Sequence, residues 1–105
     1  MEIRNEAFSS VVATATTQAL VLHEKKTAYT LLHTGLNAAK AADVNPIYLS
    51  VAPEVPDGAA GLNKMVLSAG MIIEVGVDNG DLSIAFKSIA GAPVLAVLSG
   101  ILSRS

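Results

Sequence analysis

The chain contains no cysteine and no tryptophan, and only two histidines among its 105 residues. Without cysteine it forms no disulfide and offers no thiolate to a metal ion. Charged residues are also scarce, at 15% of the chain, and the net charge is −2 with the lysines and arginines scattered. A nucleic-acid-binding surface needs a basic stripe, so this charge distribution argues against a nucleic-acid partner.

Long apolar runs are absent too. No run approaches the ~18 residues that a helix needs to cross a bilayer. The chain begins MEIRNE, with acids where a signal peptide carries a basic segment, and no long apolar segment follows. We therefore expect no membrane partner, and we expect the chain to be made in the cytoplasm.

Hydrophobic residues, in contrast, make up 51% of the sequence, and the mean hydropathy is +0.52. A small domain has much surface for its volume and needs polar side chains to cover it. An alanine-rich monomer with a weakly polar surface is one interpretation. We favour the other, in which apolar surface is buried between copies of the chain, and we expect a homo-oligomer, with a trimer as the favoured state.

The clearest pattern lies in the last third of the chain, from Met71 to Leu102, which predicts three consecutive antiparallel strands. In the middle strand Leu82, Ile84 and Phe86 alternate with polar or small residues, the period of a half-buried strand. The stretch 78–81 reads Asp-Asn-Gly-Asp, and Asn-Gly predicts a tight hairpin turn. A proline at position 93 suits the start of the last strand, whose run from 94 to 102 is apolar on both faces.

The rest of the chain adds further short strands separated by turn residues. Residues 11–22 are rich in β-branched side chains and predict one or two strands, although a helix over 6–23 is long enough to be considered. Residues 37–45 predict a helical turn or a loop. Other strands are expected over 27–36, 47–52 and 63–67. About seven or eight short strands at this spacing predict an all-β protein, a single antiparallel β-sandwich of jelly-roll type.

The first ten residues are aperiodic and are expected to form an N-terminal arm, with the sandwich domain spanning 11–105. A frayed terminus is the simpler alternative. Ile3 and Phe8 are the large apolar residues of this arm and could anchor it on a neighbouring subunit. With them we place Val11, Ile101 and Leu102 as candidate interface residues.

No residue set points to catalysis or to a bound metal. A zinc site or a catalytic triad needs at least three convergent groups, and His23 and His33 would have to meet Asp43 or Asp57 to provide them. We expect His23 at the surface and His33 in the interior or at an edge. Residues 78–81 lack the alternating ligands of a calcium loop. Glu54 and Asp57 flank a turn, where we expect them to be solvated. We expect no enzyme activity, no cofactor and no metal.

From Thr16 onward the chain contains, in order, the segments EKKTAYTLLHTGL, IYLSVAP, LSAGMIIEV, NGDLSIAFKS and AGAPVLAVLSGIL. Taken in this order, they resemble a family of small β-sandwich proteins in the virions of tailed bacteriophages. One departure is the triplet Glu-Lys-Lys at 24–26, where similar chains often carry a Pro-Ala-Gly-Lys turn.

The resemblance implies a structural virion protein without catalysis. Its first form is a capsid decoration (cement) protein, a homotrimer on the head surface whose partner is the major capsid protein or another virion protein. The alternative is a neck, tail or fibre component, including an adhesion module. Sugar-binding platforms favour exposed aromatic rings, and aromatics are only 4% of this chain, which disfavours adhesion.

Overall fold

The computed structural model describes the backbone of residues 2–22, 27–59, 61–77 and 80–103, and side-chain burial for 9–22, 28–59, 61–77 and 80–98. Within these residues the regular structure is entirely β. The strands are β1 (Glu2–Val12), β2 (Gln18–Leu22), β3 (Thr27–Asn37), β4 (Ile47–Val51), β5 (Lys64–Leu67), β6 (Ile72–Val77), β7 (Leu82–Lys87) and β8 (Pro93–Ser103).

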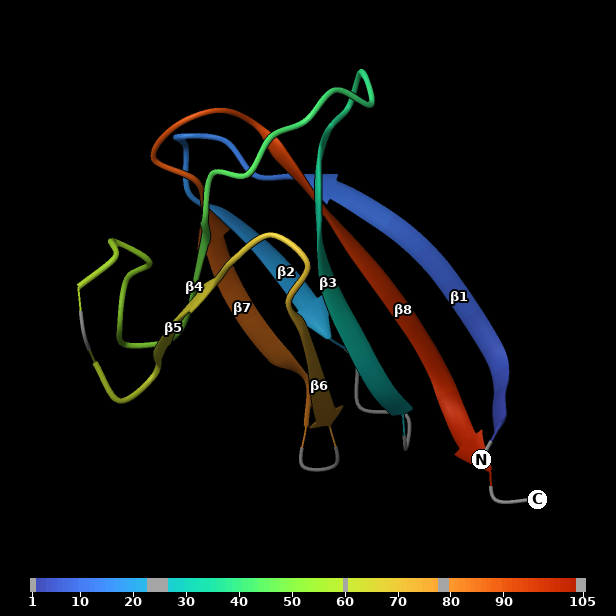
Figure 1. Ribbon diagram of the computed structural model, residues 1–105. Helices are drawn as coiled ribbons and strands as arrows, with labels where there is room; N and C mark the ends of the chain where they lie inside the picture. The colour runs from blue at the N-terminus through green and yellow to red at the C-terminus, as the bar shows by residue number, and fades with distance from the viewer. Residues whose placement is uncertain (1, 23–26, 60, 78–79, 104–105) are drawn as a thin grey trace.

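The strands form two four-stranded antiparallel sheets that face each other (Figure 1). Sheet 1 has the order β1-β8-β3-β6, and sheet 2 has the order β2-β7-β4-β5. This order is that of an eight-stranded jelly roll, in which the chain passes repeatedly from one layer to the other. The β-sandwich of jelly-roll type predicted from the sequence is confirmed. The segment 11–22 contains the end of β1 and the whole of β2, so the strand alternative holds and the helix does not form.

The predicted hairpin between β6 and β7 is wrong. β6 pairs with β3 in sheet 1, whereas β7 pairs with β2 and β4 in sheet 2, so the connection joins the two layers. Positions 78–79 of the predicted turn lie outside the described residues. The physical reason is the core: Val77 and Ile84 are 4% and 5% exposed, and they reach the same interior from opposite sheets. Turn residues specify a change of direction, but burial across the sandwich selects the pairing partner.

The core follows the alternation seen in the sequence. On β7, Phe86 is 1% exposed and Ile84 is buried, while Leu82 is half-buried at its margin. On β3, Tyr29, Leu31 and His33 lie on one face of the strand, and all three are buried. One face of each strand therefore lies against the opposite sheet, and that burial is the main stabilising contribution.

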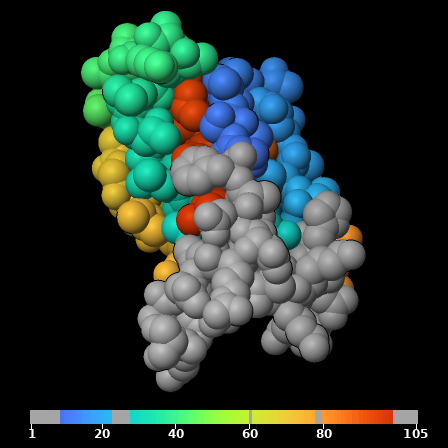
Figure 2. Space-filling model, turned by 90° about the vertical axis from the view of Figure 1, so that its right-hand side faces the viewer, coloured from blue at the N-terminus to red at the C-terminus, as the bar shows by residue number. Residues whose placement is uncertain are grey.

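β8 explains why the C-terminal run is apolar on both faces. It begins at Pro93, as predicted, and lies in the middle of sheet 1 between β1 and β3. Leu95 and Val97 point into the core, and Ala96, which alternates with them, is only 7% exposed. Figure 2 looks onto sheet 1 and shows β8 as a narrow strip between β3 and β1. In the described part of this run, residues 94–98, the flanking strands β1 and β3 thus help to cover the outward-facing Ala96.

The division predicted at residue 10 does not mark a structural break. The backbone continues as β1 from Glu2 to Val12 and pairs with β8 of the same chain, with a register shift between Arg4 and Ala7. Residues 2–10 of the predicted arm are therefore part of sheet 1. Docking of these residues on a neighbouring subunit stays a prediction.

The register assigned to β7 can be tested by comparing adjacent positions. We expect Phe86→Ala to lower the free energy of unfolding by about 3–5 kcal/mol, because it leaves a cavity in the core. Lys87→Ala changes a half-buried residue whose side chain lies on the outer face and should cost much less. Urea denaturation of both variants measures the difference, and equal losses would mean that the two faces are exchanged.

Candidate interaction surfaces

The ends of β1 and β8 bring together the interface residues predicted from the sequence. Ile3 is paired with Leu102 in the backbone ladder, and Arg4 with Ile101. Phe8 is paired with Leu98 further along β1. For these four residues (Ile3, Phe8, Ile101 and Leu102) the structure describes the backbone pairing but not the burial of the side chains.

Val11, the fifth predicted interface residue, is paired with Leu95. Its half-buried side chain packs against the hydrophobic core of its own chain. Val11 therefore contributes to the stability of its own fold. The other predicted interface residues lie towards the N-terminal end of β1 and the C-terminal end of β8, which pair with each other.

Sheet 1 is longer than sheet 2 along the strand direction. β1, β3 and β8 each have 11 residues, whereas the strands of sheet 2 have four to six. At a rise of about 3.3 Å per residue, the long strands extend well beyond the shorter layer. The paired ends of β1 and β8 form a two-stranded ribbon, seen at the lower right of Figure 1. We call residues 2–4 and 101–103 the terminal ribbon.

The outer face of sheet 1 carries an apolar row. Leu32 of β3 is paired on one side with Ile72 and on the other with Ala96. These residues alternate with the core residues of the same strands, so they face outward. Ile72 is 60% exposed and Leu32 is half-buried. This face therefore offers apolar contact area, at a place apart from the terminal ribbon.

A buried polar network joins the loops at the other end of the sandwich. His33 is fully buried, and its Nδ1 accepts a hydrogen bond from Gly35 N–H (3.0 Å), so Nε2 donates to the carbonyl oxygen of Asn45 (2.7 Å). The Asn45 amide in turn donates to Asp43 (2.7 Å). Both imidazole nitrogens have partners, so the predicted interior position of His33 is confirmed and the ring serves the fold. His23 lies outside the described residues.

Asp43 is the anchor of this network. Its carboxylate accepts hydrogen bonds from the backbone N–H of Ala92 (2.8 Å) and of Asn45 (3.2 Å). The Ala92 hydrogen bond is the main reason why the pKa of Asp43 lies below its usual value, with the Asn45 hydrogen bonds adding to it. Gly91 has a φ of +70° and lies so close that an added Cβ would meet both carboxylate oxygens of Asp43. The loop between β7 and β8 is thus held against the loop between β3 and β4.

Ser88 extends the same end of the molecule. Its buried hydroxyl lies 3.0 Å from the Pro46 carbonyl oxygen and 2.7 Å from that of Ala90, and its backbone N–H donates to Thr14. Asp57, the other carboxylate considered with the histidines, belongs to a different loop. The structure thus brings His33 and Asp43 into one network but leaves Asp57 apart, and the described residues contain no group of three or more His, Asp or Glu placed to hold a metal ion.

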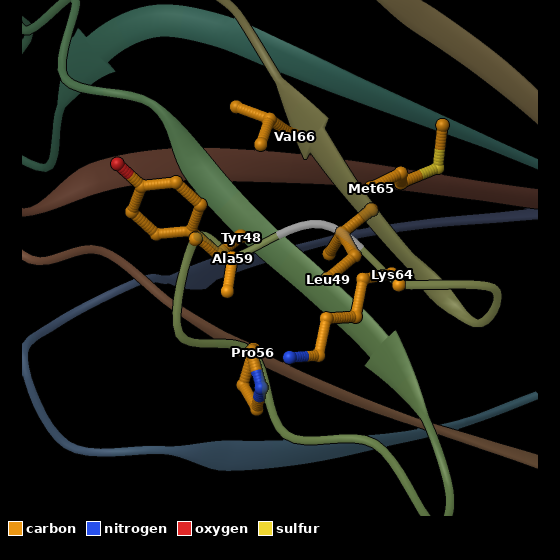
Figure 3. Close-up of a pocket in the computed structure, with 9 residues that line it drawn as sticks. Tyr48, Leu49, Pro56, Ala59, Lys64, Met65 and Val66 are labelled. Atoms are coloured by element: carbon orange, nitrogen blue, oxygen red, sulfur yellow. The ribbon is translucent and has the colours of Figure 1, made fainter.

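The loop between β4 and β5 lines one side of a hollow of about 380 Å³ on the outer face of sheet 2. Figure 3 shows Tyr48 on β4, Val66 on β5, and Pro56 and Ala59 on the loop around it. Lys64 extends toward the loop, where its ammonium lies 2.9 Å from Asp57 and 3.7 Å from Glu54. Asp57 and Glu54 keep 47% and 36% of their side-chain exposure, so they are partly solvated while they fix the loop to β5.

A second hollow, of about 400 Å³, opens between the two sheets on the side where β5 and β6 form their edges. We call it the edge groove. Its walls are mainly apolar, with core-facing residues from both sheets. They comprise Leu49, Ser50, Val51, Leu62, Asn63, Lys64, Met65, Ile73, Val75, Leu82 and Ile84.

In the part of the chain that the structure describes, no helix is long and apolar enough to cross a membrane. No family model matches the chain, and no curated protein matches it. Among solved structures, it is similar to a de novo designed double-stranded β-helix, at 12% identity with a TM-score of 0.51, over 90% of this chain and 95% of that one. A Bacillus endospore appendage protein that forms disulfide-linked pili matches at 12% identity with a TM-score of 0.48, over 94% and 87% of the two chains. The designed protein supports the fold alone.

The polar network predicts how stability changes with pH. Because the folded-state pKa of Asp43 is lowered, its contribution is fully present above the usual value of 3.8 and is lost as the pH falls below it. We expect Asp43→Asn to lower the melting temperature at pH 7, and the gap to the unchanged protein to narrow as the pH falls below 3.8. Asp57→Asn, at an exposed ion pair, should have a smaller effect at pH 7. A gap that stays constant with pH would contradict this role of Asp43.

Proposed function

We propose that this chain is a structural virion protein without catalytic activity, a capsid decoration protein that binds the outer surface of a tailed-phage head as a homotrimer. The carrying observation is the terminal ribbon, in which β1–β8 pairing places Ile3 beside Leu102 and Arg4 beside Ile101. The proposal also rests on the resemblance of the ordered segments from Thr16 onward to small β-sandwich virion proteins.

The chemistry of the surface supports an assembly role. Only 15% of the residues are charged, and apolar side chains lie exposed in several places, including Ile72 on the outer face of sheet 1. Exposed apolar groups that lie close together mark interaction sites in soluble proteins. The jelly roll is also an architecture found in viral capsid domains, which is a fold-level analogy.

The binding mode follows from the ribbon. Its edge strand, β1, has backbone groups on one side that are not used by β8, so an extended segment of a capsid protein could pair with it. Apolar side chains at the ribbon would then provide specific anchors. Three copies held together would multiply a modest affinity per copy through multivalency.

The decisive experiment compares virus particles produced with and without the gene for this chain by electron microscopy. A decoration protein should give regularly spaced density on the head that disappears with the gene. Loss of density at the neck, tail or fibres would instead assign the alternative location. If particles produced with the gene contain none of the protein, the proposal is wrong.

The ribbon can be tested on heads that lack the protein. Each buried anchor contributes on the order of 1.5–3 kcal/mol, so we expect Ile3→Ala or Leu102→Ala to weaken binding by about ten- to hundred-fold per site. Val44→Ala, a 71% exposed residue in the loop between β3 and β4, is the matched control and should bind normally. Co-sedimentation gives the affinity and a melting curve shows that each variant is folded. Normal binding by both ribbon variants would move the contact elsewhere, with the loop 53–61 the next candidate.

A further inference from the structure

The edge groove is an open part of the hydrophobic core. Ile73 and Val75 of sheet 1 and Leu49 and Val51 of sheet 2 line it, and they are the same faces that are sealed elsewhere in the sandwich. Among the described strands, β5 and β6 are the last strands of their sheets on this side, so no neighbouring strand covers the groove there. Met65, which also lines the groove, is consequently 40% exposed.

Two of the three polar residues that line the groove, Ser50 and Lys64, are already engaged within the chain. The hydroxyl of Ser50 donates to the carbonyl oxygen of Glu54 (3.1 Å), so it is already engaged. The ammonium of Lys64 is paired with Asp57 and Glu54 on the loop side of β5. The occupant that fits this groove is therefore an apolar side chain.

Leu62 is the most exposed large apolar residue in the described part of the chain, at 99%. It lies on the rim of the edge groove, immediately before β5. A leucine that projects completely into water gains nothing from its own fold. The chain thus carries an apolar projection and an apolar recess side by side on one surface.

We propose that a second copy of this chain covers the edge groove, with Leu62 of one copy entering the groove of the next. In the proposed trimer this contact closes a ring, since each copy gives one projection to the next copy and receives one. The contact would bury the apolar surface of Leu62 and that of the groove walls together. This inference specifies the contact between copies and rests on the homo-oligomer of the proposed function.

The first test measures self-association of the purified protein with no virus particles present. We expect Leu62→Asp to raise the dissociation constant between copies at least tenfold, because the contact would bury an unpaired carboxylate. Val44→Asp introduces the same charge at another exposed apolar residue and should leave association unchanged. Sedimentation velocity over a range of concentrations gives both constants, and melting curves show that both variants fold.

The second test identifies the contact directly and uses the absence of cysteine from the chain. Leu62→Cys and Ile73→Cys are placed on separate, differently tagged chains, which are mixed and mildly oxidised. A disulfide between the two tagged chains forms in the proposed contact, and its yield should exceed that from Val44→Cys mixed with Ile73→Cys.

Three outcomes would overturn the contact: a monomer at all concentrations, unchanged association of Leu62→Asp, or equal cross-linking of the two mixtures. Because neither test uses virus particles, their failure is separate from failure of the proposed function. If the unchanged protein does not bind heads but Leu62→Cys and Ile73→Cys still cross-link, the decoration role is overturned and the contact is kept. The reverse result would keep the role and remove the contact.

Discussion

Burial of one face of every strand against the opposite sheet is the constraint on which the rest of this structure depends. It decides that β6 and β7, which follow each other in the chain, lie in different layers, with Val77 and Ile84 meeting in one core. Of the described strands, only β4 and β5 are consecutive neighbours within one sheet. The resulting jelly roll leaves the side at β5 and β6 partly open, and the edge groove lies there.

The two ends of the sandwich differ in chemistry. At one end, His33, Asn45 and Asp43 form a satisfied polar network that holds the connecting loops together. At the other, the long strands of sheet 1 run beyond sheet 2 and end in the terminal ribbon. A loop end fixed by hydrogen bonds to buried groups suits a rigid support, because breaking any one of them would leave a buried polar group without a partner.

A protein with the role proposed above needs apolar surface to pack against its neighbours, and this chain has exposed apolar residues and few charges. The terminal ribbon, the outer face of sheet 1 and the edge groove are separate surfaces. We propose that the terminal ribbon binds the phage head and that the edge groove binds a second copy of the chain. Contacts at different places on one small domain can coexist, so binding to a head and association of copies need not compete.

The sequence by itself determined the positions of most strands, because alternation and turn residues act over a few neighbours: Leu82, Ile84 and Phe86 gave β7, and Pro93 gave the start of β8. The same local signals could not choose pairing partners, which is why Asn-Gly at 79–80 predicted a hairpin that does not form. Ile3 and Leu102 could be named as apolar residues, but only the pairing of β1 with β8 placed them side by side. The edge groove had no counterpart in the sequence at all. Its walls come from β4, β5, β6 and β7, and the distance between two sheets is set by packing across the core, which no short stretch of sequence encodes.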